Sequence, residues 1–155
     1  MDTPKEKKEL CIRCGALCCR LGGAVATRNE VEAIIDAGYE DYFKQVSPDV
    51  FITHWGREGV CPYLQDDTCS IYEVRPLRCR AFPVHQDSDG EIYLSLCPLA
   101  SSLDDTEIAS YSRLLRSTPS GFLQAAASVL ETKARILQRR ISRYPRRSIA
   151  LNYKK

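Results

Sequence analysis

The sequence has no long apolar run, and no apolar stretch follows its charged first residues. No segment approaches the roughly 20 apolar residues that a membrane helix needs, so we expect no membrane span. The opening residues, MDTPKEKKELCIRCG, contain neither an apolar core nor a small-residue cleavage site, which argues against a secretory signal. We therefore expect a cytoplasmic protein whose cysteines lie in a reducing environment.

Catalytic motifs and histidines are also scarce. The sequence contains no nucleophile elbow, no glycine-rich phosphate loop and no C-x3-C-x2-C radical motif. His54 and His85 are the only histidines. Either is able to replace a thiolate as a metal ligand, but a lone histidine is more often a surface or packing residue. We assign no catalytic residue, and we favour a binding protein over an enzyme.

Cysteine, in contrast, is abundant. The chain has 155 residues, the size of one ordinary domain, and eight of them are cysteines. In a reducing compartment, clustered cysteines more often bind metal than form disulfides. We therefore favour metal binding over disulfides and over unliganded buried or redox thiols. The predicted metal ligands are Cys11, Cys14, Cys18, Cys19, Cys61, Cys69, Cys79 and Cys97.

The first four cysteines lie within nine residues. Cys11 and Cys14 form a C-x2-C pair, whose two sulfurs can turn toward one ion. Cys18 and Cys19 follow shortly after Gly15. Because neighbouring side chains diverge, one member of the doublet is expected to ligate while the other packs or serves a second metal. A cluster of several metal atoms would use both, and a vicinal disulfide is a strained alternative.

The other four cysteines are dispersed, at spacings of eight, ten and eighteen residues. Cys61 and Cys97 each precede a proline, as a ligand cysteine does in ferredoxin-type iron–sulfur runs. The alternative for this group is ordinary buried thiols. Two sites of four ligands, or one cluster and one zinc ion, both fit a count of eight. In either case the two groups of cysteines must meet, so the metal is expected to join distant segments.

Several arginines lie close to the cysteines in the sequence. They would compensate the negative charge of metal-bound thiolates. The alternative is surface salt bridging with Glu73, Asp66 or Asp67. These arginines are Arg13, Arg20, Arg75, Arg78 and Arg80.

The spacing of these cysteines resembles that of the CxxCxxCC family of zinc- or iron-chelating domains. The resemblance covers about residues 11 to 98 and rests on C-x2-C-x3-CC, then CPYL, then CSIYEVRPLRCRAFP. The first block has three residues before its double cysteine, where the family's short name implies two. The resemblance implies zinc or iron bound by these cysteines. A related domain occurs in flagellin lysine methylases, in which an iron–sulfur cluster is implicated.

Helix and strand signals frame the cysteines. Thr27 to Glu30 has the form of a capping box, followed by apolar residues at helical spacing and by Gly38. This pattern predicts a helix over residues 28–37, with one further turn over 41–44. Short extended segments are expected at 50–53 and 91–96.

Two further helices are expected in the last third of the chain. One covers residues 104–116, with Ile108, Tyr111 and Leu115 on one face. The other begins at Thr118 and Pro119 and runs to about Ile141 before Pro145. Together they predict an antiparallel hairpin. Residues after Arg146 are expected to be frayed.

Charge is unevenly distributed. From Lys133 onward there are nine Lys or Arg residues and no acid, which leaves a net charge of −7 on residues 1–132. A basic end of this kind can contact nucleic acid, but a solvated helix face is the favoured interpretation, and we do not expect a nucleic-acid partner.

The sequence therefore predicts a small, loop-rich α+β protein: a metal-stapled cysteine domain over 1–100, and a helical segment over 101–155 with a basic tail. We expect zinc or an iron centre, at least partly structural. One alternative is an iron–sulfur redox protein or metalloenzyme that acts on a protein partner. A second is a zinc module that binds nucleic acid.

Overall fold

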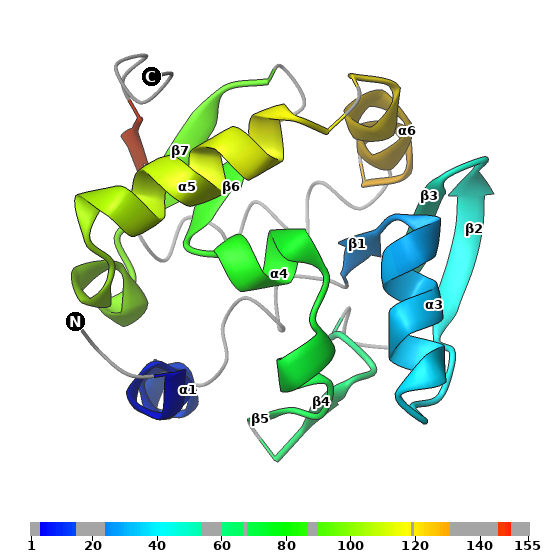
Figure 1. Ribbon diagram of the computed structural model, residues 1–155, viewed down its shortest axis with the longest axis horizontal. Helices are drawn as coiled ribbons and strands as arrows, with labels where there is room; N and C mark the ends of the chain where they lie inside the picture. The colour runs from blue at the N-terminus through cyan, green and yellow to red at the C-terminus, as the bar shows by residue number, and fades with distance from the viewer. Residues whose placement is uncertain are drawn as a thin grey trace.

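The computed structural model describes residues 4–14, 24–53, 60–66, 68–86, 90–118, 120–130 and 146–149. Helices and antiparallel sheets are mixed, which confirms a small α+β fold (Figure 1). The helices are α1 (Pro4–Cys14), α3 (Arg28–Asp36), η1 (Tyr72–Val74), α4 (Leu77–Ala81), η2 (Pro98–Ser102), α5 (Asp105–Arg116) and α6 (Ser120–Leu130). The strands are β1 (Val25–Ala26), β2 (Phe43–Ser47), β3 (Val50–Thr53), β4 (Leu64–Gln65), β5 (Thr68–Cys69), β6 (Val84–Gln86), β7 (Ile92–Ser95) and β8 (Arg146–Ser148).

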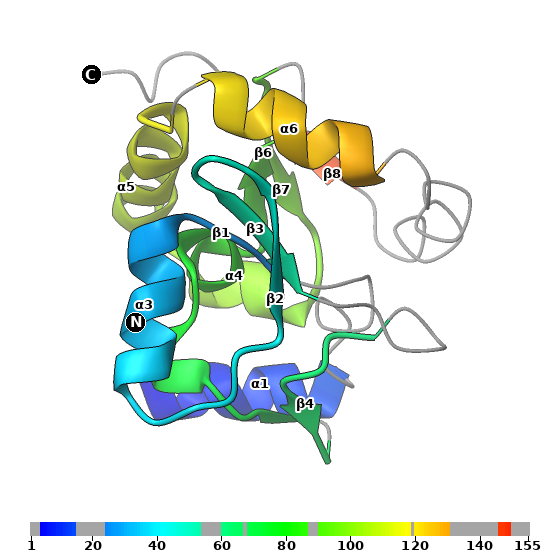
Figure 2. The same ribbon diagram turned by 90° about the vertical axis from the view of Figure 1, so that its right-hand side faces the viewer.

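The first sheet has the order β1-β3-β2 and lies at the right of Figure 1. Strands β2 and β3 form a hairpin in which Ser47 pairs with Val50. Helix α3 packs against β3, and α6 packs against both β2 and β3. Figure 2 shows α6 lying across the end of this hairpin. Val31 and Ile34 of α3 are buried in a cluster that also contains Cys61, so this core reaches the predicted ligands.

The second sheet has the order β6-β7-β8 and is covered by α5, which contacts β6. Its core contains Val84, Ile92, Leu94, Ile108 and Leu115. Helix α4 lies between the two sheets, where it contacts β1, β6 and α5 (Figure 1). The short segment that carries Cys79 is therefore packed on both sides.

The predicted capping box and the helix that follows it are confirmed as α3. The Thr27 side chain accepts a hydrogen bond from the backbone N–H of Glu30, and the Glu30 side chain accepts one from the backbone N–H of Thr27, which completes the capping box. The helix ends at Asp36, and Gly38 follows with φ +94°. Glycine adopts this left-handed conformation without the steric penalty of a Cβ.

The further helical turn expected over 41–44 is wrong. Phe43 begins β2 instead, and its side chain is buried in the first core. The Asp41 carboxylate accepts a hydrogen bond from the backbone N–H of Phe43 at 2.9 Å, which turns the chain into the strand. The extended segments expected at 50–53 and 91–96 are confirmed as β3 and β7.

Helix α5 matches its sequence pattern. Asp104 caps it by accepting a hydrogen bond from the backbone N–H of Glu107, and Ile108 and Leu115 are buried with Tyr111 packed beside them. Helix α6 begins at Ser120, but its described residues do not form an antiparallel pair with α5. The two helices pack on different sheets, and each is seen nearly end-on in the view where the other runs lengthwise (Figures 1 and 2). Ile141 and Pro145 lie outside the described residues.

The expectation that residues after Arg146 are frayed is wrong for residues 147–149. Strand β8 pairs with β7, and the backbone N–H of Ile149 donates to the Ile92 carbonyl at 2.9 Å. Ile149 is buried in the second core. Sheet pairing and apolar burial therefore hold a segment that its basic composition alone would leave in solvent. Across the described residues, no helix combines the length and the apolar character needed to cross a membrane.

Candidate metal centre

Cys61 and Cys69 lie in one small hairpin. The Leu64 N–H donates to the Cys61 carbonyl at 3.0 Å, which closes a tight turn around Pro62 and Tyr63. Strand β4 then returns to pair with β5, so that Leu64 lies opposite Cys69. Cys61 is buried and Cys69 half-buried. The turn thus brings two of the dispersed cysteines onto neighbouring backbone segments.

Cys79 reaches the same core from α4. The Pro76 carbonyl accepts a hydrogen bond from the Cys79 N–H at 3.0 Å, which forms the first turn of that helix. Cys69 and Cys79 are partly buried against the apolar cluster to which Cys61 belongs. The structure therefore brings Cys61, Cys69 and Cys79 to the border of one core, although Cys79 comes eighteen positions after Cys61 in the sequence.

Cys97 lies at a separate position, at the N-cap of η2. It is buried, and its carbonyl accepts a hydrogen bond from the Ala100 N–H at 2.9 Å. Helix η2 packs against α1. Because α1 ends at Cys14, the segment that follows Cys97 and the helix that carries Cys11 and Cys14 are neighbours.

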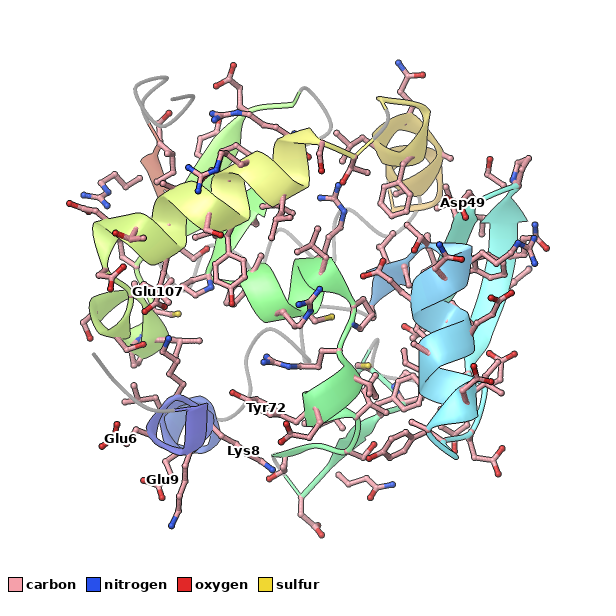
Figure 3. All side chains as sticks on the ribbon, viewed as in Figure 1. Glu6, Lys8, Glu9, Asp49, Tyr72 and Glu107 are labelled. Atoms are coloured by element: carbon pink, nitrogen blue, oxygen red, sulfur yellow. The ribbon has the colours of Figure 1, made fainter. Side chains whose placement is uncertain are left out.

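Two charged contacts hold α1 in place. Lys7 forms an ion pair with Glu107 of α5, with 2.6 Å between Nζ and Oε2. The Lys8 ammonium lies 5.2 Å from the ring centroid of Tyr72 in η1, within the range of a cation–π interaction. Figure 3 shows Lys8 reaching from α1 toward Tyr72. The N-terminal helix is thereby tied to η1, between Cys69 and Cys79.

The eight predicted ligands are placed to different extents. Cys11 and Cys14 lie in the last turn of α1, but their side chains are outside the described part, as are Cys18 and Cys19 altogether. No disulfide joins Cys61, Cys69, Cys79 and Cys97 to one another. Among the described side chains, no three of His, Cys, Asp or Glu gather as a metal site.

The donor chemistry nevertheless suits zinc or iron, because both are bound by thiolate sulfur. Where the structure describes the chain, the backbone brings the elements that carry the two cysteine groups next to each other.

His85 has neighbours typical of a packing residue. Its ring stacks between Phe82 and Tyr93, at centroid distances of 6.2 and 5.9 Å. Its Nε2 lies 3.1 Å from the Ser95 hydroxyl. These contacts fit a histidine that supports the β6–β7 pair. His54 lies outside the described residues.

Arg75 braces the segment between Cys69 and Cys79. Its guanidinium lies 3.8 Å from the Tyr72 ring centroid, and its Nε donates to the Tyr72 carbonyl at 2.9 Å. Its Nη1 is within 3.5 Å of the Cys79 carbonyl. The Tyr72 ring therefore contacts both Arg75 and Lys8. Arg75 acts here on backbone oxygens and an aromatic face, not in an ion pair with a described acid.

Arg78 and Arg80 leave α4 in other directions. Arg78 donates to the Gln86 side chain at 3.4 Å and lies 5.0 Å from the Phe122 ring centroid, so it connects α4 with β6 and α6. Burial lowers the pKa of its guanidinium, and Glu30 partly opposes this effect. Arg80 donates to the Arg75 carbonyl at 3.1 Å. The side chains of Arg13 and Arg20 lie outside the described part.

Sequence reasoning found Glu30 only as a capping residue, and it missed the other side chains that position these segments: Lys7, Lys8, Tyr63, Tyr72 and Glu107. Tyr63 and Tyr72 are inside the CPYL and CSIYEVRP motifs, so motif membership was an available signal. The partners of Glu30 and Glu107 are 47 and 100 residues away, and no local pattern indicates them.

Comparison with known proteins identifies the family of the chain. The chain matches the CxxCxxCC family, described as a putative zinc- or iron-chelating domain, over residues 10–98. No curated protein and no solved structure matches the chain. The match spans more than half of the 155 residues and includes all eight cysteines, and it supports the expectation of zinc or iron as the bound metal. The chain belongs to the CxxCxxCC family of zinc- or iron-chelating domains.

Proposed function

We propose that this protein binds zinc or iron through its clustered cysteines and that the metal is at least partly structural. The observation that carries the proposal is the packing of α1 against η2 and beside η1. These contacts bring the helix that ends at Cys14 next to the segments around Cys69, Cys79 and Cys97. A metal bound by both groups would close a loop of many residues, and such cross-links stabilise small domains.

From this packing we assign different roles to the two parts of the chain. Residues 1–100 supply the metal ligands, and residues 101–155 buttress them. Helix α5 supports the site in two ways, because Glu107 holds α1 while Ile108 and Leu115 pack on the second sheet. The alternative of an iron–sulfur protein uses the same cysteines. It differs in the bound group and in colour.

Anaerobic purification with elemental analysis tests the proposal. We expect zinc or iron in stoichiometric amount, and a chelator should lower the melting temperature by many degrees. Serine variants of Cys61, Cys69 and Cys79 should lose metal, whereas Ser70→Ala in the same hairpin should keep it. A brown protein with acid-labile sulfide would replace the mononuclear site by a cluster. A chain that folds equally well with and without metal would overturn the structural role.

A further inference from the structure

Three of the five large apolar side chains that are exposed in the described residues are close in sequence, between the last turn of α3 and the start of β2. Ile35, Tyr39 and Tyr42 are 43%, 37% and 37% exposed. Ile35 is exposed, whereas Val31 and Ile34 of the same helix are buried. Tyr39 and Tyr42 follow in the loop that leads to β2. We call this surface the α3 face.

The α3 face is strongly acidic. Glu32, Asp36, Glu40 and Asp41 are all exposed, and each is within three residues of one of its apolar side chains in the sequence. No Lys or Arg occurs between Asn29 and Phe43. Glu32, Ile35 and Asp36 follow the i, i+3, i+4 spacing that places residues along one side of a helix, and Tyr39 follows beyond the end of α3. Exposed apolar and acidic residues therefore alternate along the end of α3 and the loop that follows it.

Tyr63, which is 2% exposed, holds the loop part of this face (residues 39–42) in place. Its hydroxyl donates to the Glu40 carbonyl at 2.6 Å and accepts from the Tyr42 N–H at 3.2 Å. The two tyrosine rings meet edge to face, with 5.0 Å between centroids. A surface that is already ordered loses little entropy when it binds a partner.

The negative charge of the α3 face indicates which class of partner would bind there. Phosphate groups of nucleic acid or of an anionic membrane would be repelled by these carboxylates. A metal ion is not favoured either, because the described acids form no group of three that could hold one. Lys and Arg side chains on a partner would pair with the acids, while apolar side chains between them would cover Ile35, Tyr39 and Tyr42.

We propose that the α3 face docks a basic segment of a partner protein in which Lys or Arg residues flank apolar ones. This proposal goes beyond metal binding and does not depend on it. The face is nevertheless built on the same motif, because Tyr63 is two residues from Cys61.

Calorimetric titration of the full, metal-loaded chain with two synthetic peptides tests the proposal. Both have the same length and number of lysines; one alternates lysine with leucine, the other lysine with serine. We expect the leucine peptide to bind about tenfold tighter, the effect of removing one interface anchor. Tyr39→Ser should abolish this preference, and Asp36→Asn should weaken both peptides.

Matched controls are available on other surfaces. Leu114 is an exposed apolar residue of α5 and Glu73 an exposed acid of η1. Leu114→Ser and Glu73→Gln should leave both affinities unchanged, and circular dichroism should show that all four variants fold. Equal binding of the two peptides would overturn the proposal, as would equal losses in Leu114→Ser and Tyr39→Ser. Direct binding of a DNA duplex to the chain that is weakened in Tyr39→Ser would also overturn it.

Discussion

The carboxylate of Glu30 accepts a hydrogen bond from the backbone N–H of Leu77 at 2.5 Å, across 47 residues of sequence. Its other oxygen accepts from the N–H of Thr27 at 3.0 Å. One side chain therefore satisfies backbone donors at the start of α3 and at the start of α4. Since α4 carries Cys79, this contact ties the position of a predicted ligand to the first sheet.

Glu30→Ala should lower the free energy of unfolding by roughly 1–3 kcal/mol, because two backbone donors lose a charged acceptor. Glu32→Ala, two residues away on the exposed side, should change it by less than about 0.5 kcal/mol. Urea denaturation of the metal-loaded protein measures both. Similar losses in the two variants would mean that the contact with Leu77 contributes nothing.

Lys7→Met should weaken metal binding through α1. Its ion pair with Glu107 is mostly buried, with side-chain exposures of 21% and 18%, and its loss should cost about 1 kcal/mol. If docking of α1 is coupled to metal binding, the affinity should fall by roughly fivefold. Competition titration with a chromogenic chelator provides the measurement. Lys5→Met, at an exposed position of the same helix, is the control; an equal effect there would refute the coupling.

The two cysteines of the Cys18–Cys19 doublet should respond differently to substitution by serine. Only one of Cys18→Ser and Cys19→Ser should lose metal, since neighbouring side chains diverge and a single tetrahedral ion cannot easily take both. Metal content per chain after gel filtration distinguishes the variants. Equal loss in both would show that both sulfurs ligate, as a multi-metal cluster requires.

Tyr63→Phe should cost about 1 kcal/mol, because the Glu40 carbonyl and the Tyr42 N–H both lose their partner. It should also change the alkaline limit of stability. Burial raises the pKa of the Tyr63 hydroxyl above its ordinary value of 10.0. Above pH 10 the unfolded chain therefore loses this proton first, and stability falls as the pH rises.

The contribution of Tyr63 is fully present below pH 10 and is lost as the pH rises through the folded-state pKa. Wild type should therefore lose stability more steeply above pH 10 than Tyr63→Phe. Denaturant midpoints between pH 8 and pH 11 give the two slopes. Parallel slopes would contradict the assignment. The other tyrosines titrate in both proteins, so they cancel in the difference.

Several features of the structure can be predicted from residues that are close together in the sequence. The capping box of α3, the Asp104 cap of α5 and the apolar spacing of both helices act over three or four residues, so the sequence predicts them directly. The cysteine motifs likewise identify the family and zinc or iron as the metal, because ligand type and spacing are local properties. The strands at 50–53 and 91–96 are likewise predicted from local sequence patterns.

Other features depend on which distant surfaces meet. From the sequence, the residues after Arg146 are expected to form a frayed basic end, yet Arg147 and Ser148 pair with β7 because its backbone donors and acceptors need partners and Ile149 can be buried. Helix α6 packs on β2 and β3 instead of beside α5. The sequence by itself determined the local helices and the metal-binding chemistry. Only the tertiary structure decided that Lys7, Lys8 and Glu30 hold the cysteine-bearing segments together, since contacts across tens of residues depend on the packing of the whole chain.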